Sequence, residues 1–190
     1  MTVPHDPTVL PTDLPVPVDD GACAHLPGMK IPAIALRATN GALVDLSARH
    51  DGRTVVYAYP RTGVPGVALP QGWDAIPGAR GCTPESCSFR DHHEDLRVLG
   101  ARVFGLSTQD TAYQQEVATR LHLPFAILSD ADLAFTKTLQ LPTFQVDGMT
   151  LIKRLTLVIR GGVIEHVFYP IFPPDGHADE VCRWLSNNRI

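Results

Sequence analysis

Between residues 53 and 188 the sequence alternates short apolar runs with stretches of helical character. Runs typical of strands span 53–60, 101–107 and 124–128, and two more, 152–159 and 163–170, flank the Gly161-Gly162 turn. Predicted helices span 83–99, 110–122, 130–139 and 175–188. A chain that alternates strands and helices packs its helices on both faces of one sheet. We therefore predict an α/β fold, a three-layer sandwich whose central sheet is mixed because it ends in a hairpin.

The first 24 residues differ in character from the rest of the chain. They hold five prolines within 18 residues and show neither the basic start nor the continuous apolar core of a signal peptide. We predict a flexible, proline-rich N-terminal arm over 1–24 and one folded domain over 25–190. Two short strands joined by Asn40-Gly41 are expected at the start of that domain.

Charge and hydropathy narrow the range of partners. The net charge is −4 with no basic block, so nucleic acid is not an expected partner. No apolar run reaches the roughly 18 residues that a membrane span requires. We expect a cytoplasmic protein, in which cysteines are more often inert, metal-binding or catalytic than paired in a structural disulfide scaffold.

Residues 61–81 form a long segment without periodicity, with three prolines and five glycines. We predict a loop, anchored by Trp73. A loop of this length inside a compact domain is unusual and is often functional.

The segment GARGCTPESCSF, residues 78–89, places Cys82 and Cys87 between a glycine turn and a predicted helix. Thr83 is the expected N-cap, Pro84 the first helical residue and Glu85 part of the first turn. A helix N-terminus carries partial positive charge and unpaired N–H groups, which favour a thiolate. We therefore expect an activated thiol at Cys82, with a pKa below the value of about 8.5 for a free cysteine.

Other interpretations of the two cysteines remain open from the residues alone. They could be inert, or form a metal clip with His92 or His93, although copper proteins of this general fold use a closer cysteine pair. A disulfide oxidoreductase would use Cys-x-x-Cys, whereas four residues separate this pair. A non-enzymatic interaction domain is a further alternative. Cys182, in the closing helix, is interpreted as a half-buried packing residue. Cys23, in the flexible arm, is interpreted as a cysteine without a role, with a distant resolving role as the alternative.

Five segments, taken together and in order, resemble the peroxiredoxins, specifically the Q-type or bacterioferritin-comigratory branch. They are HLPGMKIPAIALRATNGALVDLS, YP…GCTPESCSFRD, GLSTQD, LPFAILSDAD and KRLTLVIRGGVIEHVF, and they cover roughly residues 25–187. The resemblance implies a thioredoxin-like fold and a thiol peroxidase without a cofactor.

Carried over to this chain, the resemblance makes Cys82 the peroxidatic cysteine, Cys87 the resolving cysteine and Arg154 the residue that holds the thiolate and the peroxide. It further implies a peroxide substrate, a thioredoxin or glutaredoxin-like reductant, and a monomer or homodimer. Lys153 and Arg154 are adjacent in a predicted strand, so they point to opposite faces, and the resemblance selects Arg154 as the inward one.

One departure from the family pattern concerns a hydroxyl. The family motif is Pro-x-x-x-Thr-x-x-Cys, but here Pro60 lies 22 positions before Cys82 and Ala79 occupies the threonine position. The 61–81 loop is therefore interpreted as an insertion within the motif. We predict that Thr62 supplies the missing hydroxyl, with Thr83 as the second candidate.

Overall fold

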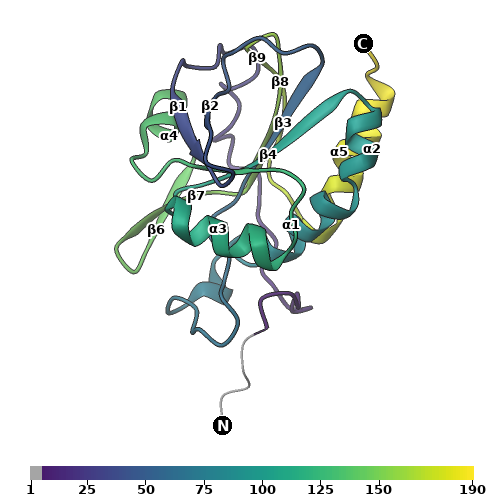
Figure 1. Ribbon diagram of the computed structural model, residues 1–190. Coiled ribbons are helices and arrows are strands. Elements are labelled where there is room, and N and C mark those ends of the chain that lie inside the picture. The colour runs from purple at the N-terminus through teal and green to yellow at the C-terminus, as the bar shows by residue number, and fades with distance from the viewer. Residues whose placement is uncertain (1–5) are drawn as a thin grey trace.

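A seven-stranded mixed sheet forms the middle of the computed structural model, which describes residues 6–190 (Figure 1). Its strands are β1 (Ala35–Ala38), β2 (Leu43–Asp45), β3 (Arg53–Ala58), β4 (Ala101–Ser107), β5 (Ile127–Ser129), β8 (Leu155–Arg160) and β9 (Val163–Phe168). They lie in the order β2-β1-β5-β4-β3-β8-β9. The pairs β3–β4 and β4–β5 are parallel, and the other pairs are antiparallel. The predicted mixed sheet is confirmed.

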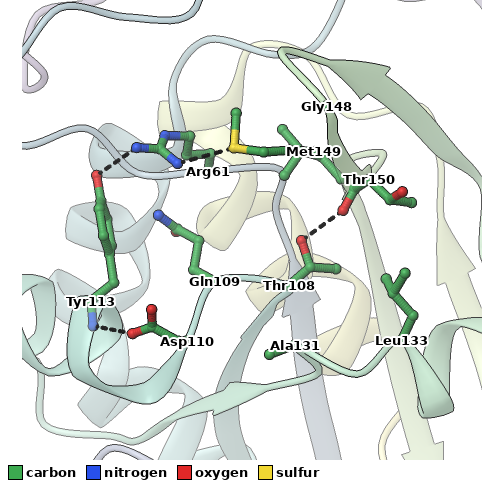
Figure 2. Close-up of a pocket in the computed structure, with 11 residues that line it drawn as sticks. Arg61, Thr108, Gln109, Asp110, Tyr113, Ala131, Leu133, Gly148, Met149 and Thr150 are labelled. Atoms are coloured by element: carbon green, nitrogen blue, oxygen red, sulfur yellow. Dashed lines mark hydrogen bonds between the residues drawn. The ribbon is translucent and has the colours of Figure 1, made fainter.

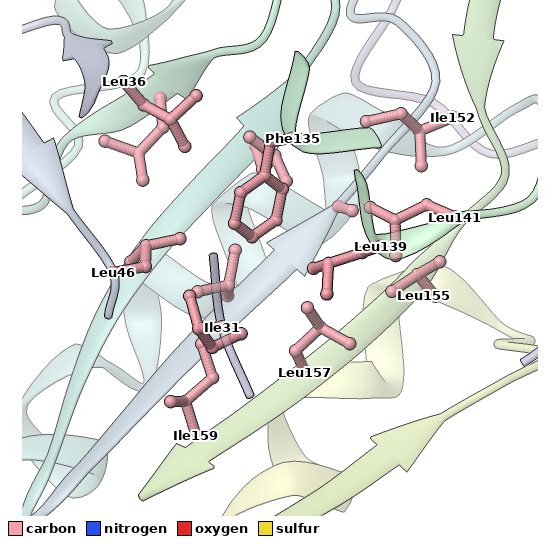
Figure 3. Close-up of a cluster of buried hydrophobic side chains, with 14 of the residues drawn as sticks. Ile31, Leu36, Leu46, Phe135, Leu139, Leu141, Ile152, Leu155, Leu157 and Ile159 are labelled. Carbon is pink, nitrogen blue, oxygen red and sulfur yellow. The ribbon is translucent and has the colours of Figure 1, made fainter. Parts of the chain in front are cut away.

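Helices cover both faces of this sheet, which confirms the three layers. The helices α1 (Cys82–Asp91), α2 (His93–Val98), α3 (Thr111–Arg120) and α5 (His177–Asn187) contribute buried side chains to one face. The opposite face is covered by α4 (Ala134–Leu139) together with the segment that precedes β1. Figure 3 shows Phe135 and Leu139 of α4 with Leu155 and Leu157 of β8 in this second core.

Strand β3 separates the two cores because its side chains alternate between the faces of the sheet. Val56 and Ala58 pack on the α4 side, whereas Val55 and Tyr57 pack on the α1 side. All four are fully buried. The Tyr57 ring stacks on Phe89 of α1 with ring centroids 4.3 Å apart, so the helix that carries both cysteines is fixed to the central strand.

The predicted helix over 83–99 differs from the observed one at its start and near its middle. It begins at Cys82, and the N-cap is Gly81, with φ of 98°, so the prediction of Thr83 as N-cap is wrong. The reason is steric: the left-handed conformation at position 81 is open to glycine, and the helix can therefore start one residue earlier. A break at His92 divides the segment into α1 and α2.

Sequence reasoning missed a hairpin outside the main sheet, formed by β6 (Thr143–Val146) and β7 (Met149–Ile152). Its turn is Asp147-Gly148, and both residues have positive φ, 47° and 73°. An Asp-Gly pair between alternating apolar residues is a hairpin signal that was available in the sequence.

The inserted loop, residues 61–81, contains one short 3-10 helix, η1 (Trp73–Ala75), and is otherwise irregular, as predicted. Trp73 is 3% exposed and packs with Ala79 and with Leu151 of β7. Phe144 of β6 also contacts it, with ring centroids 6.2 Å apart. The prediction that Trp73 anchors the loop is confirmed, and the loop is anchored to the β6–β7 hairpin.

The N-terminal arm, as far as residues 6–24 are described, contains no helix or strand and runs beside the inserted loop and the start of α1 (Figure 1). Residues 1–5 of the predicted arm lie outside the described residues. Asp20 joins the arm to the domain, because its carboxylate accepts hydrogen bonds from Lys153 Nζ and Tyr169 Oη, each at 2.7 Å. Cys23, which was expected in the flexible arm, is instead buried in the core.

Within residues 6–190, none of the helices combines the length and the apolar character that crossing a membrane requires.

Candidate active site

The register of the sheet brings Arg154 to the end of the central strand. In the antiparallel pair β3–β8, Ala58 lies opposite Leu155, so the residue before Leu155 is placed where β3 ends. The chain leaves β3 at this point, forms the inserted loop and returns at Cys82 to begin α1. Two residues that are 72 positions apart in the sequence therefore meet at the same edge of the sheet.

Cys82 occupies the first position of α1 and is 3% exposed. Arg154 Nη2 donates a hydrogen bond to its sulfur at 3.2 Å, and the thiol lies 3.5 Å from the carbonyl oxygen of Ala79. The Arg154 guanidinium and the backbone N–H of Arg61 both favour a thiolate, because each lowers the pKa of Cys82.

Arg154 is held in place by more than the thiol. Its Nη2 donates to the carbonyl oxygens of Arg80 at 2.9 Å and Gly78 at 3.3 Å, and its Nη1 forms an ion pair with Glu85. Both charged side chains are buried. A planar guanidinium with several fixed donors is the kind of group that can hold two oxygens or a sulfur at defined positions.

The two adjacent basic residues, Lys153 and Arg154, point in different directions in the structure. Lys153 turns outward and binds Asp20 of the arm, whereas Arg154 turns inward to Cys82. The position of Arg154 agrees with the predicted one, although its role in a reaction is not shown by position alone.

Sequence reasoning missed Glu85 as a member of the site. It lies three residues after Cys82, so the two side chains share one face of α1. That spacing, together with an acidic residue in an apolar helix stripe, is a signal by which it could have been found. The backbone N–H of Arg61 could not have been found, because it depends on the path of the loop.

The pKa of Cys82 is raised in this structure, contrary to the expectation of a lowered value. Burial of the sulfur is the main cause, and the negative charge of Glu85 adds to it. Arg154 and the Arg61 N–H act in the opposite direction and lower the pKa. The helix start thus supplies the expected favourable groups, but desolvation of the thiol outweighs them while the site is closed.

Cys87 lies in the same helix, partly buried against the core on the α1 side, and all four cysteines are free thiols. In a regular helix, Cα atoms five residues apart are about 8.7 Å from each other and their side chains point in different directions. A disulfide requires Cα atoms within about 7 Å. Cys82 and Cys87 therefore cannot pair while α1 is intact.

The structure places Thr62 next to the site, with its hydroxyl directed to another partner. Its Oγ1 and its backbone N–H both donate to Gln109 Oε1, at 3.2 and 3.1 Å, and the residue is fully buried. Thr83 lines the small cavity at the Cys82 sulfur. That Thr62 orients the peroxide stays a prediction, and Thr83 is the candidate that already faces the cavity.

An open cleft of about 420 Å³ adjoins this region at the ends of β4 and β5 (Figure 2). Arg61 and Tyr113 stand together at its edge, with the guanidinium 5.0 Å from the ring centroid. Tyr113 Oη donates to the carbonyl oxygen of Thr62 at 2.9 Å, so the start of the inserted loop is tied to α3. Arg61 lines both this cleft and the cavity at Cys82.

The two histidines proposed as alternative metal ligands have other neighbours. His92 Nδ1 lies 2.9 Å from the carbonyl oxygen of Ser88, and the His93 ring packs on Phe125. Among residues 6–190, no three His, Cys, Asp or Glu side chains gather in a way that could hold a metal ion.

A thioredoxin-like sandwich that buries a cysteine at a helix start beside an arginine defines a class of protein, the thiol-based redoxins. Comparison with known proteins agrees with this class, because residues 26–181 match the Redoxin family. The chain belongs to that family, and its relatives place it among the Q-type peroxiredoxins.

Two curated relatives and two solved structures illustrate the similarity. The chain is 32% identical to the chloroplastic peroxiredoxin Q of Oryza sativa subsp. japonica over 161 residues, 84% of this chain and 66% of the relative. It is 31% identical to the chloroplastic peroxiredoxin Q of Sedum lineare, covering 84% of this chain and 77% of the relative. The chain thus spans just under two thirds of the length of the rice protein.

Among solved structures, peroxidoxin BcpB from Mycobacterium tuberculosis is 26% identical with a TM-score of 0.69, covering 87% of this chain and all of that one. A PrxQ mutant from Xylella fastidiosa also has a TM-score of 0.69, at 20% identity, over 86% of this chain and 98% of that one. The second comparison supports the fold alone.

Proposed function

We propose that this protein is a thiol-dependent peroxidase that reduces hydrogen peroxide or organic hydroperoxides through Cys82. The observation that carries the proposal is the 3.2 Å contact between Arg154 Nη2 and the Cys82 sulfur, buried at the first residue of a helix. The peroxiredoxin Q relatives support the same activity.

In the first step the Cys82 thiolate attacks one oxygen of the peroxide. An S–O bond forms as the O–O bond breaks, and the electron pair of the O–O bond moves to the departing oxygen. That oxygen takes up a proton and leaves as water or an alcohol, while Cys82 is oxidised by two electrons to a sulfenic acid. Negative charge develops on the departing oxygen, and the Arg154 guanidinium is positioned to stabilise it.

In the second step we propose that the Cys87 thiolate attacks the Cys82 sulfur. A disulfide forms and the sulfenic oxygen leaves as water. Because the two Cα atoms are too far apart in the intact helix, at least the first turn of α1 has to unwind. An external dithiol, for which thioredoxin or a glutaredoxin-like protein is proposed, then supplies two electrons and restores both thiols.

The division of the chain is also a proposal: an arm over 1–24 and a peroxiredoxin domain over 25–190 that contains the inserted loop 61–81. The Redoxin match over 26–181 supports it. The cytoplasmic location and the monomeric or dimeric state stay predictions, and the plant relatives are named as chloroplastic.

The experiment that tests the function separates the roles of the cysteines. Cys82→Ser is expected to abolish peroxide consumption with a thioredoxin system as donor. Cys87→Ser is expected to consume one equivalent of peroxide and to retain a sulfenic acid that dimedone traps at position 82. Cys182→Ser, in α5, is the matched control and should turn over normally.

Peroxide reactivity that survives in Cys82→Ser would contradict the assignment of the peroxidatic cysteine. Rapid disulfide exchange without peroxide consumption in the unsubstituted protein would instead indicate a thiol-disulfide oxidoreductase.

A further inference from the structure

The N-terminal arm lies over the thiol that is proposed to react. A small, partly open pocket beside Cys82 has a volume of about 20 Å³ and is lined by Pro7 and Val9 of the arm, Leu69 and Trp73 of the inserted loop, and Cys82 and Thr83 themselves. Pro7 is buried in this position. The arm and the 61–81 loop therefore both contribute to the walls of the pocket beside Cys82.

The arm continues along the site beyond this cavity. Leu10 lies next to Gly81, where a Cβ atom would come within 3.0 Å of Leu10 Cδ1. Leu14 and Pro15 line a second cavity of about 10 Å³, which Arg154 also lines. The arm thus covers both the thiol and its guanidinium partner.

The contacts of the arm differ along its length. In the described part of the chain, the hydrogen bonds recorded for residues 7–18 stay within the arm, from Thr8 and Val9 to Asp6. Asp20 is a polar anchor of the arm to the domain, through Lys153 and Tyr169. The stretch that covers Cys82 packs through apolar side chains such as Pro7 and Leu10, and it has a fixed point at its C-terminal end.

Cys82 is 3% exposed and the pocket beside it is small, so little space is left at the thiol while the arm is in place. A cavity of about 20 Å³ is close to the space that one water molecule occupies. Hydrogen peroxide has two heavy atoms and comes nearest to fitting, whereas the cumyl group of cumene hydroperoxide has nine carbon atoms. The larger cleft of about 420 Å³ is a separate hollow, and Arg61 lines both it and the pocket beside Cys82.

We propose that residues 6–15 act as a size filter over Cys82, which admits hydrogen peroxide and slows the reaction of bulky organic hydroperoxides. This inference rests on the proposed peroxidase function and specifies the substrate class of the same site. Burial by the arm also desolvates the sulfur, in agreement with the raised pKa of Cys82.

The first test compares two substrates in full-length variants. Leu10→Ser and Pro7→Gly each weaken the packing of the arm, and the double variant weakens it further. The second-order rate for cumene hydroperoxide, divided by that for hydrogen peroxide, is expected to rise at least tenfold in the double variant. Thr12→Ala is the control, because Thr12 is on the same arm, is exposed and lines neither cavity. An unchanged ratio in the double variant overturns the filter, even if both proteins are active peroxidases.

The second test does not depend on peroxidase activity. Reduced protein is alkylated with iodoacetamide or with the bulky reagent N-(1-pyrenyl)maleimide, and peptide mass spectrometry gives the rates at Cys82 and Cys87. Pyrenyl labelling of Cys82 relative to Cys87 should increase in the double variant, with a smaller change for iodoacetamide. If no variant consumes peroxide, the proposed function fails, and an unchanged labelling ratio then overturns the covering role of the arm as well.

Discussion

Arg154 Nη2 lies 3.2 Å from the Cys82 sulfur, directly before the strand that runs antiparallel to the one from which the cysteine segment departs. The same guanidinium is paired with Glu85, one helical turn after the cysteine. The buried Arg154 guanidinium therefore contacts a thiol and a carboxylate at the same time.

Replacing Arg154 by lysine keeps the charge but removes the planar fork that contacts Cys82, Glu85 and two carbonyl oxygens. We expect at least a tenfold slower reaction with hydrogen peroxide and a higher pKa of Cys82, because Arg154 lowers that pKa in the native site. Stopped-flow kinetics and the pH dependence of alkylation measure the two effects. Arg160→Lys, on the exposed end of β8, is the control. An unchanged rate would show that the contact has no part in the reaction.

Replacing Glu85 by glutamine should lower the pKa of Cys82, because the negative charge of Glu85 raises it. The thiolate forms as the pH rises through this pKa, so the alkylation profile of Cys82 should move to lower pH. The peroxide reaction at high pH should nevertheless become slower, since Arg154 loses its ion-pair partner. Glu94→Gln, whose carboxylate is exposed on α2, should leave both profiles unchanged. A shift to higher pH would contradict the assigned electrostatic effect.

Two hydroxyl groups compete for the role of the motif threonine, and parallel valine variants distinguish them. If Thr62 turns from Gln109 to the peroxide during the reaction, Thr62→Val should slow it at least tenfold, about 1.4 kcal/mol. If Thr83 has the role from its place in the cavity, Thr83→Val should show that loss instead. Second-order rates with hydrogen peroxide decide between them, and two normal rates would leave a backbone group such as the Arg61 N–H as the donor.

Hydrogen exchange should reveal the unwinding that disulfide formation requires. Amides in residues 82–90 are expected to exchange faster in the oxidised protein than in the reduced one, because the intact helix keeps Cys82 and Cys87 apart. Cys87→Ser treated with one equivalent of peroxide should keep the slow exchange of the reduced state. Equal protection in both redox states would mean that the helix survives and that another thiol is the partner of Cys82.

Most of the fold could be predicted because its central strands and its helices leave strong local patterns. The run of valine and tyrosine predicts a buried strand, which is β3. The glycine pair predicts the turn of a hairpin, and β9 begins directly after it. The hairpin β6–β7 was missed because its strands are short and partly exposed, so the Asp147-Gly148 turn was its main signal.

The site was only partly predictable, for a different reason. Cys82 and its place at a helix start follow from local sequence, and the resemblance to peroxiredoxins adds Arg154. The pKa of Cys82 depends on burial by segments distant in sequence, so helix position alone gave the wrong direction. The partner of the Thr62 hydroxyl likewise depends on how the inserted loop meets β4 and α3, which no local pattern encodes.

The conformation of Gly81 has a consequence for which substitutions the protein can tolerate. With φ of 98°, position 81 disfavours any side chain, and a Cβ atom there would also collide with Pro174 and press on Leu10. The residue before the thiol is thus constrained from three directions: by its own backbone, by the segment that precedes α5 and by the arm. Random mutagenesis should recover few functional substitutions at position 81, and changes that shorten Leu10 should not restore them, because the backbone and Pro174 remain in place.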